Sequence, residues 1–208
     1  MKRLPELLER NKQWAARVRK ANPHFFKDLS GQQAPKYLWI GCADSRVPAT
    51  EIVDLAPGEI FVHRNVANVV VHSDFNCLSV LEFAVDVLKV EHVIVVGHYG
   101  CGGVRAVLDN HELGLADNWL GHVRDVQDRH KDALERIWDM EKRYDRLCEL
   151  NVLEQALNVC KSTVVRGAWK RGQDLTVHGW IYDLKDGIIR DLGFCAAAPG
   201  DLPDGIKG

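Results

Sequence analysis

The sequence predicts an α/β fold in which helices flank a mostly parallel central sheet. Strand-like apolar segments alternate with helical segments along the chain, an order typical of sheets connected by helical crossovers. The segment 92–97 holds four consecutive apolar residues, Val93 to Val96, and this lack of alternation is typical of a buried parallel strand. The chain has 208 residues, 46% hydrophobic and 27% charged. These values fit a single globular domain over 1–208 and exclude disordered, collagen-like and coiled-coil chains.

In the first half of the chain, strand-like apolar runs alternate with segments whose apolar residues have helical spacing. Short apolar runs predict strands at 37–41, 59–63 and 92–97. Apolar residues three or four apart predict helices over 4–20, 76–90 and 104–108. Asp74 and Asn76 are the candidate N-caps of the second helix. Asn22-Pro23 ends the first helix, so residues 1–22 form an N-terminal helical arm.

The second half predicts a long helix and a hairpin. Residues 111–145 are polar and poorly periodic, whereas 147–168 have apolar residues at helical spacing and predict one long helix that Gly172 ends. The hairpin is predicted from two strand-like runs and the turn between them, at 175–183, 188–192 and 185–187. We expect the tail, 193–208, to be loosely ordered because it is rich in Gly, Pro and Asp.

Charge and hydropathy exclude several classes of partner. Lys and Arg total 27 against 29 Asp and Glu, a net charge of −2, which gives no electrostatic footprint for nucleic acid or an anionic membrane. No apolar stretch approaches the roughly 18 to 20 residues of a membrane helix, and the N-terminus lacks the apolar core of a secretory signal. We therefore expect a cytoplasmic protein. In that reducing environment the six Cys are expected to be metal ligands, core residues or reactive thiols.

Polar residues that carry chemistry follow two predicted strands directly. Cys42, Asp44 and Arg46 come after the first strand, and His98 and Cys101 come after the third. Because ligands gather at the carboxyl ends of strands in α/β sheets, these residues can converge there. Two thiolates, an imidazole and a carboxylate suit tetrahedral Zn²⁺. Each pair alone is a weak signal, and the Asp and Arg could form only a local ion pair.

Three segments of the chain resemble the signatures of the β-class carbonic anhydrases. They are Cys42-Ala43-Asp44-Ser45-Arg46, Phe61-Val62-His63-Arg64-Asn65-Val66-Ala67-Asn68 and Gly97-His98-Tyr99-Gly100-Cys101-Gly102-Gly103. The resemblance extends more loosely over residues 23–192. It implies a zinc lyase that reversibly hydrates carbon dioxide to bicarbonate and a proton by zinc-hydroxide attack.

The resemblance also implies roles for the residues at the strand ends. Cys42, His98 and Cys101 would be permanent ligands of one Zn²⁺ per subunit. Asp44 and Arg46 would be the catalytic dyad, with Asp44 closing the site as a fourth ligand or, when Arg46 holds it, leaving that position open.

The resemblance further implies a substrate pocket and a regulatory site. The pocket would be formed by Gln33, often from the adjoining subunit, together with Phe61, Val66, Phe83 and a backbone N–H near Gly102. Trp39, Arg64 and Tyr182 match positions that distinguish a bacterial subgroup in which bicarbonate binds away from zinc and favours the closed state. Without the resemblance, the apolar residues and Trp39 would be ordinary core, and Arg64 could pair with a carboxylate.

The assembly and two alternative functions complete these expectations. The apolar stripe of the N-terminal arm is expected to pack on a partner subunit, and the resemblance implies a homodimer or homotetramer. The first alternative is a hydrolase of carbon disulfide or carbonyl sulfide on the same fold. The second is a zinc protein that senses bicarbonate without turnover.

Overall fold

The structure is a computed structural model that describes residues 4–31 and 33–203. It divides into two compact units, 1–34 and 35–208. The N-terminal unit contains helices α1 (Pro5–Ala21) and α2 (Phe25–Leu29). The rings of Trp14 and Phe26 lie edge to face with centroids 5.6 Å apart, so this unit extends beyond residue 22, where the sequence placed the end of the arm. Among the described residues, none in either helix is buried.

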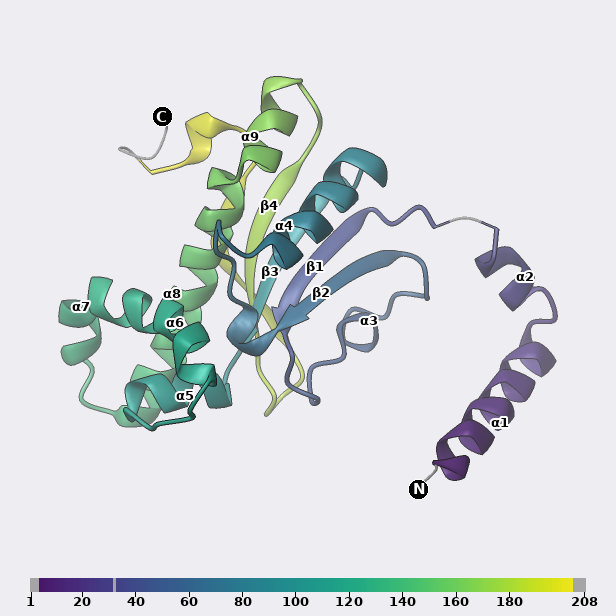
Figure 1. Ribbon diagram of the computed structural model, residues 1–208, viewed down its shortest axis with the longest axis horizontal. Coiled ribbons are helices and arrows are strands. Elements are labelled where there is room, and N and C mark those ends of the chain that lie inside the picture. Colours follow the sequence, from purple (N-terminus) through teal and green to yellow (C-terminus); the bar gives the residue numbers. More distant parts are fainter. Residues whose placement is uncertain (1–3, 32, 204–208) are drawn as a thin grey trace. The chain divides into compact units, whose positions relative to one another are not determined.

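The second unit is built on one five-stranded sheet (Figure 1). Its strands are β1 (Tyr37–Cys42), β2 (Ile60–Asn65), β3 (His92–His98), β4 (Thr176–Tyr182) and β5 (Ile189–Ala196). The spatial order is β2-β1-β3-β4-β5, in which only the β4–β5 pair is antiparallel. The apolar runs of β1 and β3 occupy the centre and are almost entirely buried. The mostly parallel sheet predicted from the sequence is confirmed.

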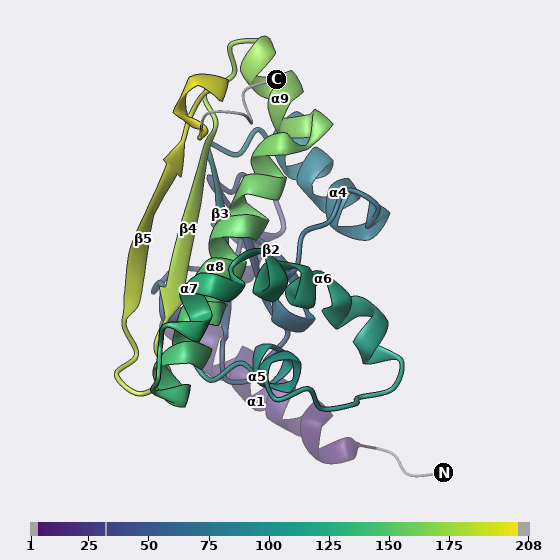
Figure 2. The same cartoon turned by 90° about the vertical axis from the view of Figure 1, so that its left-hand side faces the viewer.

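Most of the helical mass lies on one face of this sheet. The helices are α3 (Ala49–Ile52), α4 (Phe75–Glu82), α5 (Gly102–Leu108), α6 (Ala116–Arg129), α7 (Lys131–Glu135), α8 (Met140–Lys161) and α9 (Thr163–Lys170). Three single turns complete the fold: η1 (Val66–Asn68), the π-helical η2 (Phe83–Val87) and η3 (Pro199–Asp201). Figure 2 shows α4, α6, α8 and α9 on one side of β4 and β5. A second, smaller apolar cluster around Trp39 covers part of the opposite face.

The long helix predicted over 147–168 is wrong, because two helices occupy this segment. Ser162 has an extended backbone, and its hydroxyl accepts a hydrogen bond from the Val165 N–H at 3.2 Å, so it ends α8 and caps α9. Asp139 caps α8 in the same way, which places the start of that helix inside the poorly periodic segment. The predicted cap at Asp74 is confirmed. The final strand continues to Ala196, and residues 204–208 of the predicted tail lie outside the described residues.

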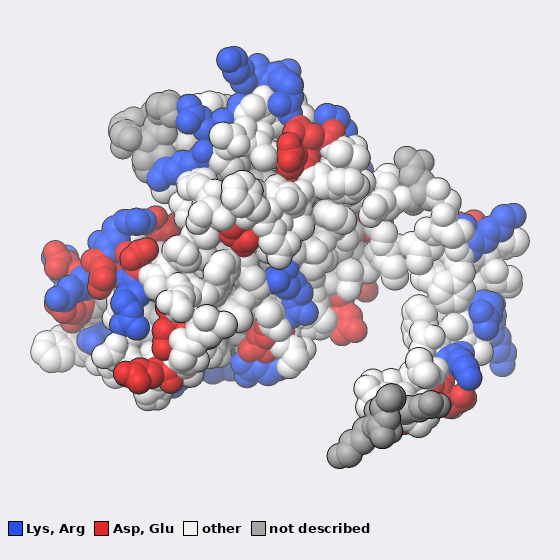
Figure 3. All heavy atoms as spheres, in the orientation of Figure 1, with Lys and Arg blue, Asp and Glu red and all other residues white. Residues whose placement is uncertain are grey.

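Two surface properties agree with the sequence. Both acidic and basic side chains occur on the face shown in Figure 3, as the nearly equal totals of 27 Lys and Arg and 29 Asp and Glu lead one to expect. Within residues 4–31 and 33–203, no helix combines the length and the apolar character that crossing a membrane requires.

Candidate metal centre

The carboxyl ends of β1 and β3 bring three donor groups together. The two strands are parallel neighbours with Gly41 opposite Val96, so Cys42 and His98 lie at the same edge of the sheet. Gly100 adopts a positive φ of 70°, a conformation that favours glycine and turns the chain back toward this edge. Cys101 follows at the start of α5. The donor atoms of Cys42, His98 and Cys101 all lie within 4.8 Å of one another, and all three residues are buried.

The imidazole of His98 is oriented for coordination. Its Nδ1 lies 3.0 Å from the backbone oxygen of Tyr99, and a donated hydrogen bond there leaves the lone pair on Nε2. Nε2 is buried and has no hydrogen-bond partner in the described part of the chain. An unpartnered polar atom in the interior is costly, and a metal ion among the three donors would satisfy it.

The two thiols have a separation that fits a shared ion. Their sulfur atoms are 3.9 Å apart, whereas two sulfur ligands of a tetrahedral Zn²⁺ at about 2.3 Å each would be about 3.8 Å apart. A hydrogen bond from Cys101 lowers the pKa of Cys42, and the same bond together with burial raises the pKa of Cys101. A bound cation would replace the thiol protons, because the thiolate form is the one that ligates a metal.

Asp44 and Arg46 form a bidentate pair beside these donors. The Arg46 Nε and Nη2 donate to Asp44 Oδ1 and Oδ2 at 2.9 and 2.7 Å, and the Arg46 backbone N–H also donates to Oδ1 at 2.9 Å. The hydrogen bonds from the Arg46 side chain hold the pKa of Asp44 well below its usual range. The Oδ2 atom is 3.8 Å from His98 Nε2. The pair therefore faces the donor cluster and is more than a local loop ion pair.

Three of the predicted pocket residues lie beside the donor cluster or beside each other. The rings of Phe61 and Phe83 are 5.9 Å apart, and Gly102 begins α5 directly after Cys101. Val66 and Phe83 are 45% and 42% exposed, so the alternative that they are ordinary core is wrong. Gln33 belongs to the N-terminal unit, and its role stays a prediction.

The three residues of the predicted regulatory site lie on the same face of the sheet, because the register pairs Arg64 with Gly41, two residues after Trp39, and Gly41 with Val96, whose partner Trp180 is two residues before Tyr182. Trp39 is fully buried in the smaller cluster, against which Tyr182 also packs. The Trp39 Nε1 atom has no hydrogen-bond partner among the residues described. Arg64 Nε donates to the Cys42 carbonyl at 2.8 Å, and its Nη2 donates to the Asp44 carbonyl. Within the described residues Arg64 thus bonds to backbone oxygens, and the alternative of a carboxylate partner is wrong.

Sequence reasoning missed the polar residues on the buried face of α8. Asn151 and Gln155 are each 1% exposed and hydrogen-bond to the segment 67–70. Their signal was present, since Asn151, Gln155 and Asn158 recur every three or four residues within an apolar stripe.

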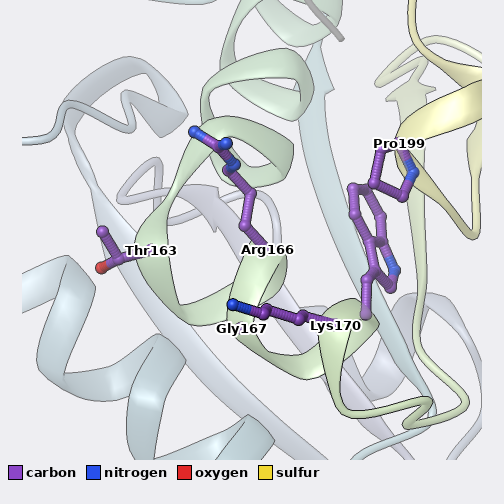
Figure 4. Close-up of a pocket in the computed structure, with 6 residues that line it drawn as sticks. Thr163, Arg166, Gly167, Lys170 and Pro199 are labelled. Atoms are coloured by element: carbon purple, nitrogen blue, oxygen red, sulfur yellow. The ribbon is translucent and has the colours of Figure 1, made fainter. Parts of the chain in front are cut away.

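Two further features lie outside this centre. His63, Asp74 and Cys77 have donor atoms within 4.8 Å of one another, but Asp74 is already engaged as the cap of α4. A cavity of about 510 Å³ is lined by Thr163, Arg166, Gly167, Trp169, Lys170 and Pro199. In Figure 4 the Arg166 and Lys170 side chains extend away from Pro199 and do not converge.

Comparison with known proteins identifies the family to which this fold and this site belong. The sequence profile of the carbonic anhydrase family matches residues 37–189. A carbonic anhydrase of Emericella nidulans is 46% identical over 199 residues, which is 96% of this chain and 86% of the relative. The chain belongs to the carbonic anhydrase family, in its β class, and is thus an enzyme of the lyase type.

Solved structures agree with this assignment. The β-carbonic anhydrase of Coccomyxa, in complex with acetazolamide, has a TM-score of 0.91 and 41% identity over 97% of this chain and 91% of its own. One of two tetrameric β-carbonic anhydrases of Sordaria macrospora has a TM-score of 0.88 and 40% identity over 93% and 98%. The bacterial, bicarbonate-regulated subgroup stays a prediction, because these relatives do not place the chain in it.

We predict that the chain binds one divalent metal ion and loses it in Cys101→Ser. Cys148→Ser is the matched control, because Cys148 is also buried, and burial raises its pKa to about 12, but it is not one of the clustered donors. Total metal per chain, measured by plasma mass spectrometry after gel filtration, should fall only in Cys101→Ser. Equal loss in both variants would contradict the assigned ligand set.

Proposed function

We propose that this chain catalyses the reversible hydration of carbon dioxide to bicarbonate and a proton, with one Zn²⁺ per subunit. The observation that carries the proposal is the buried Nε2 of His98, which has no hydrogen-bond partner among the described residues and lies beside two thiols and the Asp44–Arg46 pair. Membership of the carbonic anhydrase family supports the reaction. The donor chemistry supports the metal, since Zn²⁺ favours N and S ligands.

In this proposal Cys42, His98 and Cys101 would hold the ion, and Asp44 would be an exchangeable fourth ligand. When bound, Zn²⁺ supplies Lewis acidity that lets water act as a nucleophile near neutral pH. Two thiolates cancel much of the ionic charge, so the water is less acidified than it would be by three neutral His ligands. The side chains around the water must therefore hold it in a favourable orientation for attack.

Asp44 is suited to orient the attacking water. Because Arg46 keeps the Asp44 carboxylate ionised, its Oδ2 can accept a hydrogen bond from water but retains a proton poorly. The carboxylate thus aligns the nucleophile, and the released proton passes on to buffer. Arg46 fixes the direction of the carboxylate through its fork of N–H groups.

Carbon dioxide is small, apolar and uncharged, so its pocket needs apolar walls and a donor for the oxygen that becomes negative. Phe61, Phe83 and Val66 provide apolar surface. The N–H of Gly102 and the amide of Gln33, the latter by family resemblance, are the proposed donors.

The first test is stopped-flow carbon dioxide hydration from about pH 6.5 to 9, a range that spans the pKa values of zinc-bound water. We expect activity in the parent and a loss of about 10²- to 10⁴-fold in kcat/KM for Asp44→Asn, which removes an acceptor at the reacting centre. The exposed Asp125→Asn should retain parent activity. Carbonyl sulfide and carbon disulfide are assayed beside carbon dioxide. A zinc-loaded parent that hydrolyses only the sulfur compounds would contradict the proposed substrate.

We further propose that bicarbonate regulates this site through Trp39, Arg64 and Tyr182. The buried Trp39 N–H has no partner in the described part of the chain and would gain one from an oxyanion. Arg64 bonds to the carbonyls of Cys42 and Asp44. An anion that competed for the guanidinium would therefore alter the backbone of a metal ligand and of the gating carboxylate together.

This regulation predicts a rate that rises with pH more steeply than loss of one proton allows. Arg64→Ala removes the anion ligand, and Tyr182→Phe removes only a hydroxyl, so both should flatten the profile toward a single-proton rise. The parent pH profile with and without added bicarbonate is the measurement. Variant profiles that match the parent would exclude this regulatory site.

We also propose a homodimer or homotetramer. Leu4, Leu7 and Leu8 of the N-terminal unit are 59%, 53% and 68% exposed, and apolar surface of this kind marks an interaction site. The Sordaria macrospora relatives are tetrameric by their description. Sedimentation at micromolar concentration should give a mass of two or four chains, and a monomer would be evidence against assembly.

A further inference from the structure

The segment Val66–Val70 has an unusual backbone directly behind the donor cluster. Ala67 and Asn68 have positive φ values of 63° and 47°, which residues with a Cβ adopt uncommonly. Both are buried, with relative exposures of 0% and 2%. No glycine in this segment provides the conformation, so contacts from the surrounding structure must hold it.

This segment touches the neighbourhood of all three donors. Residues 66–68 pack against β1, the strand that ends at Cys42, and the Ala43 N–H donates to the carbonyl of Asn65, the residue before the segment, at 2.8 Å. A Cβ on Gly97, the residue before His98, would lie 3.4 Å from Asn68 Oδ1. A Cβ on Gly103, two residues after Cys101, would lie 3.2 Å from Val66 Cγ1. A shift of this segment would therefore displace residues that adjoin each donor.

Three amide side chains of α8 hold the segment in place. Asn151 Nδ2 donates to the Ala67 carbonyl at 2.8 Å, and Asn151 Oδ1 accepts from Gln155 Nε2 at 3.0 Å. Gln155 Oε1 accepts from the Val70 N–H at 2.8 Å, and Asn158 Nδ2 donates to the Val70 carbonyl at 2.9 Å. Each amide thereby fixes the orientation of the next, and the chain of bonds ends on Ala67.

The same helix also presses on β3 beside His98. A Cβ on Gly97 would be 2.5 Å from Val152 Cγ2, so α8 and β3 approach as closely as a glycine permits. Asn151 and Val152 are adjacent in sequence and act on the two sides of the centre. The helix thus fixes the segment behind Cys42 and the strand that ends at His98.

We propose that Asn151, supported by Gln155, is a positioning residue for the metal centre, which it acts on through Ala67. The inference rests on the proposed function, because it assumes that Cys42, His98 and Cys101 hold Zn²⁺. The side-chain hydrogen bonds of Asn151 go to the Ala67 carbonyl and to Gln155, so it would act on the donors indirectly. Replacing a residue that orients metal-ligating side chains typically lowers metal affinity by about 10- to 100-fold.

The test compares Asn151→Leu with Asn158→Leu in the zinc-loaded, full-length protein. Both substitutions delete an amide that donates from α8 to a backbone carbonyl, but only Asn151 reaches Ala67. Zinc release to the chromophoric chelator 4-(2-pyridylazo)resorcinol is timed, and the thiolate-to-metal absorption of the cobalt-loaded protein is recorded. Melting temperatures show whether the two variants lose comparable stability.

We expect Asn151→Leu to release zinc about 10- to 100-fold faster than the parent and to shift the cobalt–thiolate band. Asn158→Leu removes a bond only at the Val70 end of the segment, so it should change both quantities clearly less than Asn151→Leu does. If Asn151→Leu fails to fold, Asn151→Asp replaces it, since it keeps the shape and loses the amide donor. Equal acceleration in the Asn151 and Asn158 variants, or none in the Asn151 variant, overturns the inference alone. A parent that binds no zinc overturns the proposed metal and this inference together.

Discussion

The pairing of β1 with β3 is the constraint on which the site depends. Because the two strands are parallel neighbours with Gly41 opposite Val96, the residues that follow them leave the same edge of the sheet. Cys42 and His98 therefore lie close together at the ends of their strands, and the turn at Gly100 brings Cys101 back to them. The Asp44–Arg46 pair, the Val66–Val70 segment and α8 are then arranged around that edge. A shift in the register of these two strands would therefore move Cys42 away from His98.

Much of this arrangement could be predicted from local sequence. The consecutive valines of β3 and the polar residues just after it mark a buried strand and its ligand edge. The break at Ser162 was missed because the apolar spacing continues across it, and only the capping geometry reveals it. The left-handed backbone of Ala67 has no local signal at all, because nothing in the sequence forces an alanine into it. Asn151 was missed because its role depends on the backbone carbonyl to which it donates, and the sequence does not show which carbonyl that is.

The centre concentrates several arrangements that a stable core avoids. One small region holds two thiols whose pKa values shift in opposite directions, and two non-glycine residues at positive φ. It also holds an imidazole nitrogen that has no partner among residues 4–31 and 33–203. Each costs free energy in isolation. The continuous apolar core beneath the sheet offsets these costs and holds the groups in place. Unfavourable local features of this kind, held in place by a well-packed core, are typical of functional sites.

The separation of the donors along the chain bears on how the protein matures. Cys42 and Cys101 are 59 residues apart, and His98 with Cys101 provides only two of the donors. No short stretch of the newly made chain can therefore act as a high-affinity precursor of the site. The complete set exists only once the crossover between β1 and β3 has closed, a slow and non-local step in folding. If the chain binds zinc as proposed, metal uptake would follow the assembly of the sheet, and a metal-loaded chain would be one whose β1 and β3 had already paired.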